Sequence, residues 1–206
     1  MNNNEFGFSR ILTYIFHPIL IPFLAISTLM LLPNIFTIVL PNVLKIWFVS
    51  IVFLFTIAIP SISMYILFKF KAIESFEMND RSERTIPLLV SCTSFMALLY
   101  VLKETNIPPV FLYLLYSATF SLLVGLLINL VYKISLHTLG WGALAATLIS
   151  ISLRMGFTLL IPIIVSVVIS GLVGYARLKQ NAHKQAEIYL GYVVGATVII
   201  FIANFI

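Results

Sequence analysis

Long apolar runs alternate with short polar stretches along the whole chain. Runs of this length predict membrane-spanning helices, because a helix needs about 20 mostly apolar residues to cross the hydrocarbon core of a bilayer. The third and fifth runs are short and could be tilted, partial or merged, so six or seven crossings are expected. The runs are Ile11 to Leu32, Val43 to Phe68, Ile86 to Leu102, Pro109 to Tyr132, Leu139 to Leu153, Phe157 to Tyr175 and Ile188 to Ile206.

The composition excludes an ordinary soluble domain. Hydrophobic residues make up 61% of the 206 residues and charged residues 9%, whereas soluble domains hold about 45–50% and about 25%. Only helices and closed barrels satisfy their backbone hydrogen bonds in lipid, and continuous apolar runs indicate helices. We therefore expect an all-α, polytopic transmembrane helix bundle, with residues 1–206 forming a single integral membrane domain. The expected location is a bacterial inner (cell) membrane.

Three prolines lie inside the predicted helices, at Pro18, Pro22 and Pro60. A proline lacks the backbone N–H and crowds the preceding turn, so each should kink its helix. Membrane helices tolerate such kinks when neighbouring groups bond to the freed carbonyls.

The charged residues gather in three polar clusters, and two predicted helices separate each cluster from the next. Because two crossings return the chain to the same side, all three clusters should emerge on one side of the membrane. The clusters hold Lys69, Lys71, Glu74, Glu77, Asp80, Arg81, Glu83 and Arg84; then Lys133 and His137; then Arg177, Lys179, Lys184 and Glu187. Ionisable groups at the rim of a bundle indicate a functional site. The side with the three clusters holds more lysine and arginine, which favours a cytoplasmic location for it. Some of these basic residues are expected to serve the chemistry of the site and not the orientation of the protein, so both orientations stay open.

His183 and Glu187 stand four residues apart at the start of the last predicted helix, so their side chains share one face. A carboxylate there can accept a hydrogen bond from one imidazole nitrogen and leave the other free to attack. Arg177, six residues before His183, could hold a phosphate with two hydrogen bonds. This spacing predicts a nucleophilic histidine beside an anion site. An incidental ion pair at a helix end is the competing interpretation.

A second histidine precedes the fifth apolar run, in the segment from Lys133 to Thr138. A helix that begins there would present free backbone N–H groups to an anion, and Ser135 lies beside them. His137 could donate a proton to a departing oxygen. A loop histidine without a chemical role is the alternative.

Together these segments resemble the three motifs of the type 2 phosphatidic acid phosphatase (PAP2) superfamily, which groups membrane lipid phosphatases with a fold related to vanadium haloperoxidases. The third family motif, Ser-Arg, five residues, His, three residues and Asp, has the spacing of Ala176-Arg177, His183 and Glu187. The second, Pro-Ser-Gly-His, is similar to Ile-Ser-Leu-His at 134–137. The first, Lys, six residues and Arg-Pro, is loosely similar to residues 80–87, with Glu77 standing where the lysine is expected.

The resemblance implies a PAP2/haloperoxidase-like core and a hydrolase that acts on phosphoric monoesters or diphosphates of lipids without metal or cofactor. His183 would attack phosphorus to form a phosphohistidine, Glu187 would orient it, and His137 would protonate the leaving oxygen and then activate water. The resemblance also implies which residues hold the phosphoryl oxygens. These are Arg84, Arg177 and Ser135, with Arg81 and Lys133 as auxiliaries.

Two other functions stay open. The segment with Asn79, Asp80, Glu83 and Arg84 is faintly similar to the Asn-Asp-x-x-Asp motif of magnesium-dependent intramembrane prenyltransferases, although the chain has no second acidic motif. A non-catalytic lipid-binding or transport protein would release no phosphate from any lipid. His17, a polar residue inside the first span, is expected to bond a carbonyl of a neighbouring helix.

The expected partners are the bilayer and a lipid phosphate. Polyprenyl (di)phosphates, phosphatidic acid, phosphatidylglycerophosphate and lipid A phosphates are all candidates. A net charge of +5 and a pI near 9.4 suit an anionic headgroup and membrane surface. Nucleic acid is not expected, because the basic residues are divided among loops at the bilayer. The pattern favours no particular oligomeric state.

Overall fold

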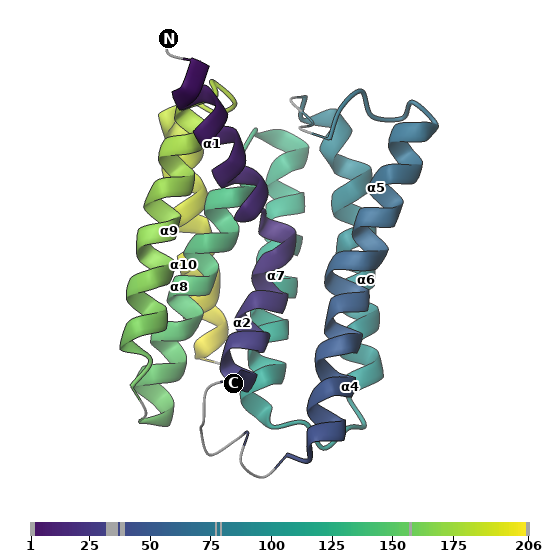
Figure 1. The fold of residues 1–206 in the computed structure, drawn as a ribbon, viewed down its shortest axis with the longest axis vertical. Coiled ribbons are helices and arrows are strands. Elements are labelled where there is room, and N and C mark those ends of the chain that lie inside the picture. The colour runs from purple at the N-terminus through teal and green to yellow at the C-terminus, as the bar shows by residue number, and fades with distance from the viewer. Residues whose placement is uncertain are drawn as a thin grey trace.

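The structure is a computed structural model that describes residues 3–31, 37, 40–76, 78, 80–156 and 158–204. This part of the chain is helical, and the long helices stand side by side with roughly parallel axes (Figure 1). The helices are α1 (Asn3–Ile15), η1 (Pro18–Leu20), α2 (Ile21–Leu31), α4 (Asn42–Phe53), η2 (Leu54–Ala58), α5 (Ile59–Lys69), η3 (Ser82–Arg84), α6 (Thr85–Leu102), α7 (Pro109–Val131), α8 (Leu136–Met155), α9 (Leu160–Lys179) and α10 (Gln185–Ala203).

Seven helical stretches of the described chain are long and apolar enough to cross a membrane, which confirms the prediction of a polytopic all-α bundle. The two runs that looked short are full-length helices, 21 residues over Ser82–Leu102 and 19 over Leu136–Arg154. The apolar pattern predicted later starts for these two spans because their first turns carry the polar residues Arg84 and His137. The predicted ends Leu32, Phe157 and Ile206 lie outside the described residues.

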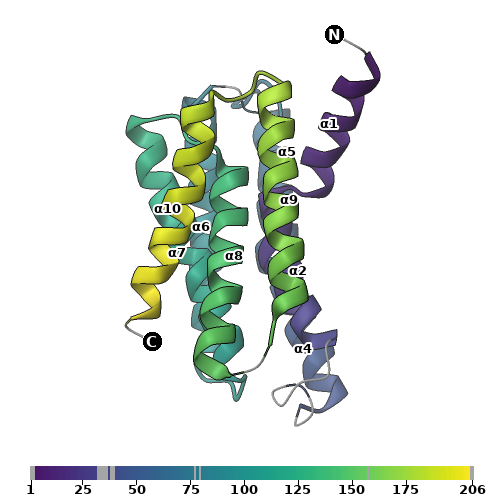
Figure 2. The same ribbon diagram turned by 90° about the vertical axis from the view of Figure 1, so that its left-hand side faces the viewer.

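The prolines act in three different ways. At His17 and Pro18 the first span breaks into α1, η1 and α2, and α1 leans away from the direction of α2 (Figure 2). Before Pro60 the helix widens into the π-helical turn η2, and the carbonyl of Phe55 accepts the hydroxyl of Ser94 at 2.6 Å. The predicted kink at Pro22 is not found, because Pro22 lies in the first turn of α2, where a missing N–H is tolerated.

The largest apolar core packs the helices together at one end of the bundle. It joins the second half of α2 to α4, to the end of α6, to the start of α7 and to the second halves of α8 and α10. Its fully buried members include Ile26, Phe48, Leu98, Phe111, Ile151 and Ile199. The opposite end, where α5, α7 and α9 finish and α6, α8 and α10 begin, is called here the polar end; it is at the top in Figure 1.

Helices α8 and α10 approach closely through two glycines of α10. A methyl group at Gly191 would meet the hydroxyl of Thr138 and would lie 2.8 Å from the carbonyl oxygen of Ser135. One at Gly195 would lie 2.9 Å from the amide nitrogen of Ala143. Small residues four positions apart allow membrane helices to pack backbone to backbone. This contact places the start of α10 directly beside the start of α8.

Candidate functional site

A cavity of about 410 Å³ opens among the helices at the polar end. Its size is that of a small-molecule site. Residues from all three polar clusters line its mouth, including Arg84, His137, Arg177, Gln180 and His183. The clusters therefore share one side of the bundle, as the spacing of the spans predicts. Below this rim the wall is mostly apolar, and along α8 it runs from Leu136 to Thr147, which is roughly 17 Å of helix.

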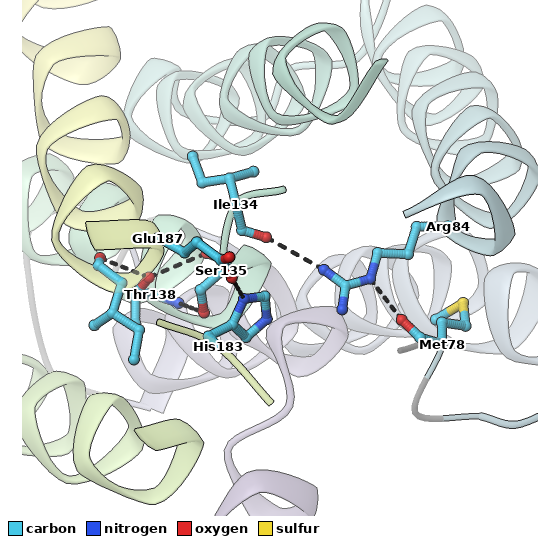
Figure 3. A network of polar contacts seen from close by, with 8 residues as sticks. Met78, Arg84, Ile134, Ser135, Thr138, His183 and Glu187 are labelled. Atoms are coloured by element: carbon cyan, nitrogen blue, oxygen red, sulfur yellow. Dashed lines mark hydrogen bonds and ion pairs between the residues drawn. The ribbon is translucent and has the colours of Figure 1, made fainter. Parts of the chain in front are cut away.

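His183 and Glu187 form a buried pair at this rim. The chain turns after α9 through Asn181, whose positive φ of 53° suits asparagine, and α10 then begins at Gln185. The Nδ1 atom of His183 lies 2.6 Å from Oε2 of Glu187 (Figure 3). A carboxylate oxygen accepts, so Nδ1 carries the hydrogen and Nε2 keeps its lone pair. The four-residue spacing predicted that His183 and Glu187 share a helix face, and the structure adds that they are in hydrogen-bond contact.

The surroundings keep the imidazole of His183 uncharged. Its burial lowers the pKa of His183 well below the ordinary value of 6.5. Three nearby cations lower it further, and these are Arg84, Arg177 and Lys133. A neutral imidazole with a free Nε2 is the nucleophilic form of histidine.

Arg84 reaches the site from the start of α6, although its side chain is only 4% exposed. Its Nε donates to the carbonyl of Met78 at 2.7 Å, and Nη1 donates to the carbonyl of Ile134 at 3.3 Å. In Figure 3 the guanidinium lies across from His183 and between these two carbonyls. The bonds fix the plane of a cation that would otherwise be costly to bury.

Arg177 lies in the last turn of α9 and is 6% exposed. Its Nη1 donates to Oε1 of Gln180 at 3.3 Å. The side-chain amide nitrogen Nε2 of Gln180 in turn donates to the carbonyl of Ser9 at 2.7 Å and to the hydroxyl oxygen of Thr13 at 3.1 Å. Gln180 thus connects the predicted phosphate ligand to helix α1.

The start of α8 carries the second predicted motif. Ser135 is its N-cap, because its hydroxyl accepts the amide hydrogen of Thr138 at 3.5 Å. Ser135 is fully buried and does not line the cavity, so its role as a phosphate ligand stays a prediction. His137 does line the cavity, and its Nε2 lies 3.4 Å from the carbonyl of Thr13. A carbonyl can only accept, so Nε2 carries the hydrogen and Nδ1 holds the lone pair.

The two predicted auxiliary cations lie outside the cavity lining. Lys133 is half-buried and is close enough to act on His183. The side chain of Arg81 is exposed, and its carbonyl accepts the side-chain amide of Asn129 at 3.1 Å. Contact of either cation with a substrate stays a prediction.

The acids that suggested a metal-dependent enzyme do not converge. Oε1 of Glu83 accepts the backbone amide of Glu74 at 2.8 Å, and Asp80 is exposed. Within the described part of the chain, no three His, Cys, Asp or Glu side chains gather as metal ligands would. Asn79 and Glu77 lie outside the described residues.

Sequence reasoning missed the contribution of helix α1. Arg10, Thr13, Tyr14 and His17 all line the cavity. Arg10, Thr13 and Tyr14 share one face of α1, and this spacing of three and four residues was the signal available in the sequence, whereas His17 follows the helix at the break. His17 does not bond a neighbouring carbonyl as expected; its Nδ1 accepts the backbone amide of Ile19 at 3.3 Å.

The polar end thus joins a histidine–carboxylate pair, two buried arginines and two further imidazoles around one cavity. This arrangement suits an anion with an apolar remainder. Comparison of the chain with family models, with curated proteins and with solved structures gives no match.

Proposed function

We propose that this protein is a membrane lipid phosphatase that hydrolyses a lipid phosphate or a polyprenyl (di)phosphate through a phosphohistidine on His183. One observation carries the proposal. His183, joined to Glu187 at 2.6 Å, lines a cavity that Arg84, Arg177 and His137 also line. The resemblance to the PAP2 superfamily assigns the same residues to the same chemistry.

In the first step, Nε2 of His183 attacks phosphorus in line with the bond to the lipid oxygen. The P–N bond forms as the P–O bond breaks, and the imidazolium form of His137 gives its Nδ1 proton to the departing oxygen. The carboxylate of Glu187 holds the Nδ1 hydrogen and balances the positive charge that develops on the ring of His183.

In the second step, Nδ1 of His137 takes a proton from water, and the resulting hydroxide attacks phosphorus. The P–N bond breaks, inorganic phosphate leaves, and His183 returns to its neutral form. Arg84 and Arg177 hold the non-bridging oxygens in both steps. Fixed cations aimed at developing charge supply much of the rate in phosphoryl transfer.

The lipid part would occupy the apolar depth of the cavity. Buried side chains of α2, α6 and α7, including Ile26, Phe95 and Leu114, form its wall. The exposed lining residues come from α1, from α5 and from the segment after α5: Arg10, Tyr14, Ser61 and Phe76. An acyl or isoprenyl chain would therefore reach the cavity from the side, between α1 and α5.

Phosphate release tests the proposal. Purified protein in detergent is given phosphatidic acid, phosphatidylglycerophosphate, a polyprenyl diphosphate and lipid A, each with and without EDTA. We expect release from at least one substrate, in the presence of EDTA, and none from the His183→Ala variant. Absence of release from every substrate, or wild-type turnover by His183→Ala, contradicts the proposal. Loss of activity with EDTA would favour the metal-dependent alternative.

A further inference from the structure

The break in the first span is fixed by the helix that carries His137. Nε1 of Trp141, on α8, donates to the carbonyl of Phe16 at 3.0 Å, and the two rings meet edge to face. Pro18 then begins η1 with His17 as its N-cap. The break therefore holds His17 at a constant position relative to α8.

His17 and His137 are neighbours across this junction. Their ring centroids lie 5.1 Å apart, with the planes at 82°. Both rings line the cavity that also holds Arg177 and His183. His17, at the break between α1 and η1 and more than 60 positions before the first of the three motifs, thus stands inside the candidate site.

The hydrogen bond from Ile19 determines the tautomer of His17. The amide nitrogen of Ile19 is a donor, so Nδ1 of His17 must accept and hold a lone pair. The neutral ring then carries its hydrogen on Nε2, at the opposite edge. Among the described residues, no side chain or carbonyl accepts that hydrogen. Nε2 is not among the buried atoms that lack a partner, so this N–H is open to the cavity that His17 lines and is available to an acceptor on a ligand.

We propose that His17 is a further ligand of the substrate phosphate, and that its Nε2–H donates to a phosphoryl oxygen beside His137. This inference rests on the proposed function. It gives the two neighbouring rings different tasks. His17 holds the substrate as a fixed neutral donor, while Nδ1 of His137 gives a proton to the leaving oxygen and then takes one from water.

Two substitutions separate this role from a purely structural one. His17→Asn keeps an oxygen where Nδ1 lies and remains a good N-cap for Ile19, but its amide stops short of the Nε2 position. His17→Gln reaches the Nε2 position with an amide N–H but is a poorer cap. A ligand role therefore predicts tighter phosphate binding by the Gln variant, and a capping role predicts the reverse order.

The experiment measures binding to the full chain in detergent by titration calorimetry, together with the apparent Tm. Inorganic phosphate and hexadecyl phosphate are the probes, and tighter binding of hexadecyl phosphate identifies a lipid source. We expect His17→Asn to keep its Tm and to weaken binding of both probes by about 10-fold or more, the value of one hydrogen bond to a charged group. His17→Gln should lower the Tm and bind more tightly than His17→Asn.

The inference is overturned if His17→Asn binds as well as wild type or better than His17→Gln, or if the wild type binds neither probe. If His17→Gln does not fold, binding by the folded Asn variant decides alone. A wild type that binds phosphate but releases none from the lipid panel would end the proposed phosphatase function, while the order of the two variants would still test His17 as a phosphate ligand.

Discussion

Ser135 donates its backbone N–H to the backbone carbonyl of Glu187, with nitrogen and oxygen 3.2 Å apart. Ser135 caps helix α8, whose first turn carries His137, and Glu187 holds His183. A second bond, from the hydroxyl of Thr138 to the carbonyl of Ile188 at 3.0 Å, joins the same two helix starts. The two proposed reacting imidazoles are therefore positioned by one backbone contact, and their functions should be sensitive to it.

The carboxylate of Glu187 should be needed for turnover. Glu187→Gln would put an amide against Nδ1 of His183, favour the wrong tautomer and slow phosphate release by about 100-fold or more. Glu187→Asp keeps the negative charge on the same helix face and should retain most activity. Initial rates of phosphate release measure both effects.

Glu104→Gln is the matched control, because Glu104 is exposed at the opposite end of the bundle. It should have wild-type rates. Equal rates for all Glu187 variants would remove the orienting role from that carboxylate.

Arg177 should not be replaceable by lysine. Its guanidinium donates to Gln180 at 3.3 Å and presents its N–H groups in a fixed plane, a fork that matches the oxygens of a phosphoryl group. The shorter, rotating ammonium of Arg177→Lys would reproduce the charge but not this fork, so kcat/KM should fall by about 10-fold or more. Arg154→Lys, in the last turn of α8 at the far end, is the matched control. A fully active Arg177→Lys enzyme would mean that only surface charge matters there.

Local patterns in the sequence predicted the parts of the site that one helix or one turn creates. The four-residue spacing of His183 and Glu187 was sufficient to place both on one face, and long apolar runs were sufficient to locate seven spans. Contacts between distant segments were not predictable in this way. Arg84 bonds a carbonyl 50 residues away, and Gln180 bonds Ser9 across 171 residues.

The role of α1 shows why. Hydropathy treats Ile11 to Leu32 as one apolar span, in which Pro18 predicts only a kink. Only the packing of α1 on α9 and of Trp141 on Phe16 brings His17 to the cavity. The glycine contact between α8 and α10 is similar: the sequence contains the spacing, but the partner helix is known only from the fold.

His183 should stay neutral well below pH 6.5. For a ring with the ordinary pKa, the neutral fraction would fall about 30-fold between pH 8 and pH 5. Burial and nearby cations instead lower the pKa of His183. NMR of histidine-labelled protein, with the His183 signal identified from its loss in His183→Gln, should show no titration of this residue from pH 8 to pH 5. A midpoint near 6.5 would contradict a desolvated nucleophile.

The lowered pKa of His183 also makes the stability of the fold depend on pH. The pKa of His183 is lower in the folded chain than in the unfolded chain, so the unfolded chain takes up the extra proton as the pH falls below 6.5. The stability from this group is therefore present above pH 6.5 and lost on acidification. The apparent Tm of wild type should fall more between pH 6.5 and pH 5 than that of His183→Gln. Parallel Tm curves would argue against the shift.

A methyl group at Gly191 should weaken both the fold and the site. In Gly191→Ala it would press on Thr138 and on the carbonyl of Ser135, 2.8 Å away, and would separate the two helix starts that hold His137 and Glu187. Overpacking of this kind costs about 1–3 kcal/mol, so the apparent Tm should fall and phosphate release should slow with it.

Gly171→Ala is the matched control, since no atom lies within 4 Å of its added methyl group on α9. That variant should be as stable as wild type or slightly more stable, because alanine favours helix over glycine by about 1 kcal/mol. If the two variants behave alike, the close contact of α8 with α10 does not position the site.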